Sequence, residues 1–230
     1  MNRRFVKPCS PTTASKPPTG DRWTHEIKWD GYRFQIIKDG RTVRLFSRNG
    51  ADWTFRLPWI AAAFARLPAR VAQIDGELCL CDARGRPDFR GLMRAAALKP
   101  ADETSLSFHA FDLLQLNDTD LKPKPLVERR KRLVDLVHRL GDAVPVLYLP
   151  DQFASGAELL TMCGRMHLEG ILSKRLDRPY VSGPTKDCSR SSAPRGKRRT
   201  AGGTRYSRNG DGPGAVRGDC YQGRCVYAIP

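Results

Sequence analysis

The segment from Glu26 to Arg33 constrains this chain most, because it places a single lysine, Lys28, between two apolar runs. An aspartate and a glycine follow the lysine, and Arg33 closes the segment. A lysine attacks as a nucleophile only after it loses a proton, which desolvation or nearby cations favour. A phosphorus atom would suit it as electrophile, since Arg33 could hold phosphate oxygens and Gly31 allows a close backbone approach. The alternative is a solvated lysine and arginine beside a strand.

Hydrophobic periodicity predicts one domain of the α/β class, with residues 1–22 as an extended lead-in. Residues 32–38 and 42–47 form an expected β-hairpin around a two-residue turn at Asp39-Gly40. Further helices are expected at 59–67, 89–98, 126–140 and, capped by Ser155, to about 166, with strands at 71–81, 106–114 and 170–175. The polar residues of interest lie at the ends of these strands, so they are expected to converge.

Five motifs follow one another along the chain. They are Lys28-Trp29-Asp30-Gly31-Tyr32-Arg33, Ser47-Arg48-Asn49-Gly50, Asp75-Gly76-Glu77-Leu78, Phe108-His109-Ala110-Phe111-Asp112-Leu113-Leu114 and Glu169-Gly170-Ile171-Leu172-Ser173-Lys174-Arg175. This series resembles the covalent nucleotidyltransferases, and within them the ATP-dependent DNA ligases of the bacterial end-joining type. The resemblance runs from about Phe5 to Asp187.

The resemblance implies an α/β fold of the α+β type: an adenylation domain of mixed, mainly antiparallel sheets with flanking helices, over residues 23–187. It also implies a reaction with ATP and Mg²⁺ or Mn²⁺ as cofactors. Lys28 would attack the α-phosphorus of ATP, form a lysyl-AMP and pass the AMP to a DNA 5′ phosphate. A 3′ hydroxyl would then displace AMP and join the strands, as in DNA repair and recombination.

By the same resemblance, Lys28 is the catalytic residue, and the carboxylates of Glu77 and Glu169 are the metal ligands, which suits the preference of Mg²⁺ for oxygen. The expected nucleotide-binding residues are Glu26, Arg33, Arg48, Phe111 and Lys174. From spacing alone, Phe111 would be a core residue and Glu26 a salt-bridged surface residue.

The charge balance favours a polyanionic partner. The chain has 40 Lys and Arg against 24 Asp and Glu, a formal net charge of +16, and such a charge makes nucleic-acid binding sensitive to salt. Four consecutive basic residues of the expected helix 126–140 are candidates for DNA contact, although a solvated helix face is the alternative: Arg129, Arg130, Lys131 and Arg132.

The expected partners are nicked or broken duplex DNA and, by resemblance, Ku-like proteins and a polymerase or nuclease on other chains. We expect a monomer in the bacterial cytoplasm, associated with the nucleoid, with no membrane contact. Neither Cys79-x-Cys81 nor Cys220-x₄-Cys225 has the partner pair that a zinc site needs. No role is assigned to the histidines His25, His109, His138 and His167.

The end of the chain departs from the family pattern. After Asp187, relatives continue with a Trp-Leu-Lys-Val-Lys-Cys-like strand whose two lysines hold the α-phosphate, whereas this chain reads Cys188-Ser189-Arg190-Ser191-Ser192-Ala193. The codons TGC-TCA-AGG-TCA-AGT-GCG encode this hexapeptide, and the neighbouring frame gives Leu-Lys-Val-Lys-Cys. We therefore hypothesise that one nucleotide was lost near codon 188. Residues 188–230 are then a non-homologous, disordered tail, the OB-fold domain of the relatives is absent, and activity is impaired.

Two other functions remain open from the sequence. The chain could be a non-catalytic, basic nucleic-acid-binding remnant that uses its charge and no chemistry. It could also be an RNA ligase or a capping-type nucleotidyltransferase that uses the same lysine chemistry on another nucleotide or nucleic acid.

Overall fold

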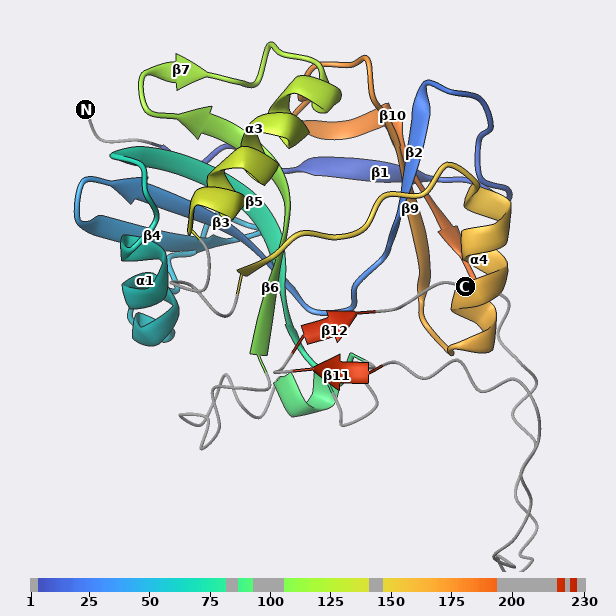
Figure 1. Cartoon of the computed structure of the whole chain (residues 1–230), viewed down its shortest axis with the longest axis horizontal. Coiled ribbons are helices and arrows are strands. Elements are labelled where there is room, and N and C mark those ends of the chain that lie inside the picture. The colour runs from blue at the N-terminus through green and yellow to red at the C-terminus, as the bar shows by residue number, and fades with distance from the viewer. Residues whose placement is uncertain are drawn as a thin grey trace, which may run out of the picture.

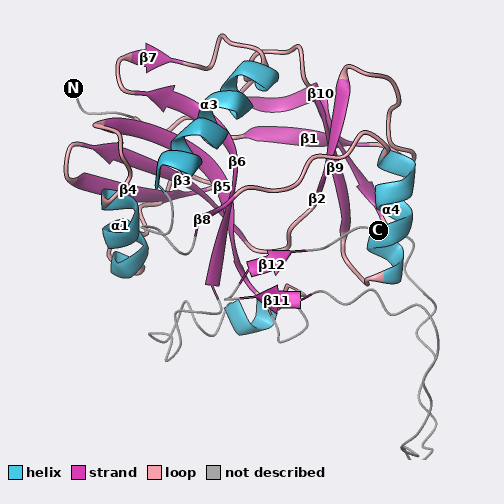
Figure 2. Cartoon of the chain, viewed as in Figure 1, coloured by secondary structure: helices cyan, strands magenta, loops and turns pink. Residues whose placement is uncertain are grey.

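Two main sheets with helices on their outer sides, and a separate two-stranded ladder, make up the described part of the protein (Figures 1 and 2). A computed structural model describes residues 4–81, 87–92, 106–140 and 147–193, and the backbone of short strands at 219–221 and 224–226. None of the helices in these stretches is long and apolar enough to cross a membrane.

The larger sheet has the strand order β4-β3-β5-β6-β7, with β8 paired to β6. Its strands are β3 (Tyr32–Asp39), β4 (Thr42–Ser47), β5 (Val71–Leu80), β6 (Leu106–Leu116), β7 (Thr119–Asp120) and β8 (Leu147–Tyr148). Helices α1 (Pro58–Ala65) and α3 (Leu126–Leu140) pack against it. Alternation along the strands buries Phe34, Ile74 and Phe108 towards these helices. The opposite face therefore carries the polar residues of β3, β5 and β6.

The smaller sheet has the order β1-β10-β9-β2, and all its neighbouring strands except β1 and β10 are antiparallel. The strands are β1 (Cys9–Thr13), β2 (Trp23–Ile27), β9 (Gly170–Arg175) and β10 (Gly183–Ser192), and α4 (Gly156–Arg165) covers one face. The Ser155 hydroxyl accepts a hydrogen bond from the Glu158 amide and caps α4. A second, smaller core around Ile27, Leu159 and Ile171 joins α4 to the sheet.

The predicted α+β class with mainly antiparallel sheets is confirmed, and the predicted elements match the observed ones closely. The hairpin of β3 and β4 pairs Asp39 with Thr42, so its two turn residues are Gly40 and Arg41 rather than Asp39 and Gly40. Gly40 has a φ of 60°, which glycine adopts without strain. Of the predicted helix 89–98, residues 89–92 are helical and the remainder lies outside the described residues.

The predicted lead-in is extended, but it contributes β1 to the smaller sheet beside β10. A larger difference concerns the predicted disordered tail. Strand β10 continues to Ser192, and its residues 188–192 pair with β9 from Lys174 back to Gly170. Disorder from residue 188 is therefore wrong for residues 188–193. The main-chain hydrogen bonds of a strand flanked by β1 and β9 do not depend on which side chains it carries.

Farther along the tail, β11 (Asp219–Tyr221) and β12 (Arg224–Val226) form a two-stranded ladder. Disorder is thus also wrong for these six residues, where Tyr221 and Val226 favour extended backbone. The rest of the predicted tail, residues 194–218, 222–223 and 227–230, lies outside the described residues.

The side of β10 that faces α4 carries hydroxyls where an apolar side chain would fit. Ser191 lies opposite the buried Ile171, and its hydroxyl is buried with no hydrogen-bond partner; the same is true of the Ser189 hydroxyl. An unpaired buried hydroxyl costs about 1–3 kcal/mol. Such positions agree with the hypothesis that the segment's codons were read in another frame.

We expect Ser191→Val to stabilise the protein, because it removes an unpaired buried hydroxyl and adds a methyl group beside Ile171. The expected gain in the free energy of unfolding is about 1–3 kcal/mol, measured by urea titration. Ser182→Val, at an exposed position before β10, is the matched control and should change it by less than about 0.5 kcal/mol. Equal effects at both positions would contradict the packing argument.

Candidate active site

One face of the smaller sheet carries most of the predicted site. Side chains alternate across a strand, so the pairing register decides which residues share this face. Glu26 lies opposite Leu172, which lies opposite Arg190, and Lys174 lies opposite Cys188. The Lys28 amide donates to the Gly170 carbonyl at 2.9 Å and continues the β2 to β9 pairing past Ile27. Lys28 therefore follows Glu26 on the face that turns away from α4.

Lys28 lies at the end of β2 and forms an ion pair with Glu169, which immediately precedes β9. The lysine side chain is 25% exposed and the glutamate 44%, so solvent can reach both. Two glycines near this pair pack tightly against neighbouring strands. A Cβ at Gly31 would lie 2.2 Å from the Leu78 carbonyl oxygen of β5, and a Cβ at Gly170 would lie 2.2 Å from the Ser191 carbonyl oxygen of β10. A side chain at either position would push the chain next to Lys28 or Glu169 away from that strand.

Glu26 and Lys174 form a second ion pair on this face. Glu26 is 2% exposed, and only one of its carboxylate oxygens is paired; Oε1 is buried with no hydrogen-bond partner. Burying an unpaired carboxylate oxygen is costly. Glu26 therefore offers an acceptor to any donor group that enters beside Lys174.

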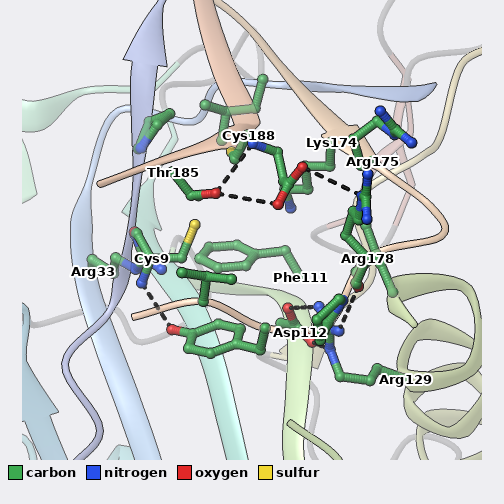
Figure 3. A pocket seen from close by; sticks show the side chains of 17 residues that line it. Cys9, Arg33, Phe111, Asp112, Arg129, Lys174, Arg175, Arg178, Thr185 and Cys188 are labelled. Atoms are coloured by element: carbon green, nitrogen blue, oxygen red, sulfur yellow. Dashed lines mark hydrogen bonds and ion pairs between the residues drawn. The ribbon is translucent and has the colours of Figure 1, made fainter. Parts of the chain in front are cut away.

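A pocket beside these residues centres on Phe111 of β6 (Figure 3). The Lys174 ammonium lies 4.5 Å from the centre of the Phe111 ring, and the Arg33 guanidinium lies 5.2 Å from it. Three arginines also line the pocket wall, together with the carboxylates of Asp112 and Asp187: Arg129, Arg175 and Arg178. An aromatic ring among cations provides a stacking surface and favours an anionic ligand.

Arg33 is held more firmly than the sequence suggested. It donates two hydrogen bonds to Asp75, at 3.0 and 2.7 Å, and a third to the Cys9 carbonyl at 2.6 Å. The Tyr180 hydroxyl also donates to Asp75, at 3.0 Å. Burial acts to lower the pKa of Arg33, but the Asp75 carboxylate outweighs it and raises the pKa. Arg33 thus lies at the pocket as a fixed cation.

Glu77 of β5 lies opposite Arg33 on one side and His109 on the other, on the polar face of the larger sheet. Burial raises its pKa to about 8, although Arg33 and Lys28 act to lower it. The pKa of Asp30 is also raised, by burial and by the Glu169 carboxylate. The positive charge of Lys28 thus acts to lower the pKa of Glu77, and Lys28 forms an ion pair with Glu169.

The donor set fits a hard divalent cation. Glu77 and Glu169 offer carboxylate oxygens, and the raised pKa of the half-buried Glu77 carboxyl is one that a positive charge would lower. Within the described residues, no group of three or more His, Cys, Asp or Glu side chains could hold a metal by itself. Phosphate oxygens and water would have to complete the coordination.

The predicted DNA-contact helix face is partly wrong. Arg129 is 3% exposed and donates two hydrogen bonds to Asp112, at 2.7 and 2.8 Å. Arg130 is 8% exposed and donates to the carbonyls of Ala110 and Pro150. These two residues fasten α3 to β6 and cannot contact a phosphate backbone. Lys131 is exposed and Arg132 pairs with Glu128, so only these two remain candidates.

Arg48 is exposed in the turn after β4 and does not line the Phe111 pocket.

Sequence reasoning also missed residues that support the site. Asp75 binds Arg33, and the Tyr180 hydroxyl donates to Asp75. His109 stacks on Trp29, next to Lys28, with ring centres 3.9 Å apart. Burial lowers the pKa of His109 to about 3, so its ring is neutral. The alternation of Asp75 and Glu77 on one strand was the available signal for Asp75.

Arg190 and Ser192 lie at the positions where the family resemblance implies two phosphate-binding lysines. Across the three strands β10, β9 and β2, Ser192 lies opposite Gly170, whose carbonyl accepts from the Lys28 amide. In the same way, Arg190 lies opposite Leu172, which lies opposite Glu26. Arg190 and Ser192 are both exposed on the face of Lys28. The first position thus holds a cation, Arg190, whose Nε donates to the Thr13 hydroxyl at 3.1 Å, and the second holds an uncharged serine.

Comparisons with known proteins agree with this geometry. The family model described as ATP dependent DNA ligase domain matches residues 6–189. The multifunctional non-homologous end joining protein LigD of Pseudomonas aeruginosa is 36% identical over 184 residues, which cover 80% of this chain and 21% of that protein. DNA ligase C1 of Mycolicibacterium smegmatis is 31% identical over 87% of this chain and 60% of its own length.

Among solved structures, the ligase domain of LigD from M. tuberculosis superposes with a TM-score of 0.69 at 29% identity, covering 81% of this chain and 60% of that one. A mycobacterial DNA ligase D complexed with ATP and MES gives a TM-score of 0.68 at 28% identity, with the same coverage. This chain spans about a fifth of the length of the LigD proteins that it matches.

Proposed function

The chain belongs to the ATP-dependent DNA ligase family, and from this membership we propose that it forms a covalent lysyl-AMP at Lys28 and transfers the AMP to a DNA 5′ phosphate. The observation that supports this most directly is the position of Lys28, on the same face as Lys174 and beside the cationic pocket of Phe111. The α-phosphorus of ATP would form a bond to Nζ while its bond to pyrophosphate breaks, and the nitrogen would lose its proton.

The surroundings of Lys28 indicate what each residue contributes. Lys28 is ion-paired with Glu169, so its Nζ must leave this carboxylate before it attacks. Phe111 would stack on the base, and Lys174 would lie within reach of phosphate oxygens once the pocket is filled. Glu77 and Glu169 would hold Mg²⁺ or Mn²⁺, which supplies positive charge to the phosphate oxygens.

The free oxygen of Glu26 supports the choice of adenine. The 6-amino group of adenine is a donor, whereas the corresponding group of guanine is an acceptor, and a buried carboxylate oxygen can pair only with a donor. A site built around such a bond strongly rejects a ligand that cannot form it. The Glu26 side chain thus favours ATP over the GTP of capping-type enzymes.

The proposed substrate is nicked or broken duplex DNA, as the names of the LigD relatives suggest, with Ku-like and polymerase or nuclease partners on other chains. We further propose that the protein acts as a monomer at the nucleoid in the bacterial cytoplasm. The exposed Lys131, with Arg132, would contribute to salt-sensitive binding of the phosphate backbone.

Nucleotide selectivity tests the proposal. With Mg²⁺ present, α-labelled ATP should label the protein covalently at least about 10²-fold faster than α-labelled GTP, because adenine presents a donor at its 6-position to Glu26 where guanine presents an acceptor. Glu26→Gln should lower the ratio of the ATP labelling rate to the GTP labelling rate, since the glutamine amide can donate to the 6-oxygen of guanine. Glu158→Gln, on the exposed side of α4, is the matched control. Faster labelling by GTP would indicate a capping-type enzyme, and no labelling by either nucleotide would indicate a non-catalytic remnant.

A further inference from the structure

Two cysteines line the wall of the Phe111 pocket. Cys9 begins β1, and Cys188 lies in β10 where that strand has extra residues, because Thr185 pairs with Pro11 while Ser189 pairs with Thr12. Both thiols are free, and Cys188 is buried whereas Cys9 is half-buried. Figure 3 shows the two sulfur-bearing side chains on the same side of the Phe111 ring.

The two thiols lie on the same pocket wall, and their interaction shifts their pKa values in opposite directions. The hydrogen bond with Cys188 lowers the pKa of Cys9, and the positive charges of Arg33 and Lys174 lower it further, against the effect of burial. The same hydrogen bond raises the pKa of Cys188, and burial adds to this. Cys9 is therefore the more reactive thiolate, and Cys188 is the neighbouring thiol that can react with an oxidised Cys9.

Cys9 is also joined to the residues that hold the pocket. Its carbonyl accepts from Arg33, and its amide donates to the Tyr180 hydroxyl at 3.0 Å. Arg33 and Tyr180 both bind Asp75, beneath the Phe111 ring. A disulfide requires a sulfur separation of about 2.05 Å, closer than two hydrogen-bonded thiols. A bond between the sulfurs would therefore draw Cys9 towards β10 and disturb this network.

We propose that Cys9 and Cys188 are an oxidisable thiol pair, which hydrogen peroxide converts into a disulfide that impairs the nucleotide pocket. The Cys9 thiolate attacks a peroxide oxygen, the O–O bond breaks, and a sulfenic acid forms as hydroxide leaves and takes up a proton to become water. The Cys188 sulfur then attacks the sulfenic sulfur, the S–O bond breaks, and a second water leaves. Two thiols are oxidised and one peroxide is reduced.

Formation of the bond is tested first, without nucleotide. The full chain is treated with hydrogen peroxide, its remaining thiols are alkylated, and its peptides are mapped by mass spectrometry without reduction. We expect a peptide pair that joins Cys9 to Cys188 and separates on reduction. Cys81→Ser, at a half-buried cysteine outside the pocket, should keep this pair, while Cys9→Ser and Cys188→Ser should lose it. Free, alkylated Cys9 and Cys188 after treatment would overturn the proposal.

The effect on the pocket is tested second, and this part rests on the proposed function. For each variant, the rate of AMP labelling is measured before and after peroxide treatment, and the quantity compared is the ratio of the second rate to the first. We expect the ratio to fall by about 10- to 100-fold in the unaltered chain and in Cys81→Ser, because small displacements at a reacting site have effects of this size. The ratio should stay near one in Cys188→Ser.

An unchanged ratio in a chain whose disulfide has formed would overturn the effect on the pocket. Absence of labelling before peroxide would instead contradict the proposed function, and the peptide map would still decide whether the thiol pair exists. The two failures are therefore distinguishable.

Discussion

Lys28→Arg is expected to acquire no acid-labile AMP when it is incubated with α-labelled ATP and Mg²⁺. Arginine keeps the positive charge and can pair with Glu169 as the lysine does, so the local structure should persist. Its guanidinium does not lose a proton in proteins and cannot supply a nucleophilic lone pair. Removal of a covalent nucleophile costs about 10⁴-fold or more in rate, which lies below detection in a gel assay.

The matched control for this variant is Lys186→Arg, which makes the same change at an exposed position in β10. It should label like the unaltered chain. Acid treatment should release the label, as expected for a phosphoramidate, and peptide mapping should place it on Lys28. Labelling of Lys28→Arg at the rate of the control would assign the covalent bond to another residue and overturn the proposed mechanism.

The success of the sequence in predicting the fold has a local physical basis. The β3-β4 hairpin and the Ser155 cap of α4 depend on contacts between residues a few positions apart, and their patterns are visible in the sequence. Lys28 and Glu169 are 141 positions apart, and no local pattern joins them. That both belong to one site was predicted through the family resemblance, which carries long-range information that periodicity lacks; their ion pair was not predicted.

The failure at α3 has an equally definite cause. Leu126, Leu133 and Leu140 recur at seven-residue intervals on the buried side of the helix, and Arg129 and Arg130 lie on that same side. The spacing therefore placed both arginines inward, where they bind Asp112 and main-chain carbonyls of the larger sheet. Charge alone suggested DNA contact, but these partners lie 17 to 20 positions away in the chain, where local reasoning does not reach.

The end of β10 shows a different reason why sequence-based prediction fails. Composition predicted disorder from residue 188, because the segment offers few apolar side chains. The strand forms nevertheless, since β1 and β9 supply main-chain partners on both of its edges. The side chains of the segment fit their surroundings less well than its main chain does: the buried hydroxyls of Ser189 and Ser191 on one face have no hydrogen-bond partner, and Ser192 on the other face is uncharged.

Replacing Arg190 and Ser192 by lysine is expected to raise the rate of AMP labelling by about 10²- to 10³-fold. Fixed positive charge aimed at the developing charge of a transition state has effects of this size. Ser192 lies opposite Gly170, which lies opposite Lys28, so residue 192 is two strand spacings of about 4.8 Å each from the nucleophile. A lysine side chain at residue 192 is long enough to reach a phosphate bound beside Lys28. The strand is already formed, so the new side chains need no change of fold.

Ser182→Lys separates this effect from a general gain of charge. It adds one cation at an exposed position before β10, outside the paired strand, and should leave the labelling rate nearly unchanged. If Ser192→Lys labels no faster than Ser182→Lys, the α-phosphate does not lie against this end of β10. If Arg190→Lys and Ser192→Lys together increase labelling and Lys28→Arg abolishes it again, the gain depends on the same nucleophile. The result would then support the hypothesis that a change of reading frame after Asp187 removed phosphate-binding lysines from this strand.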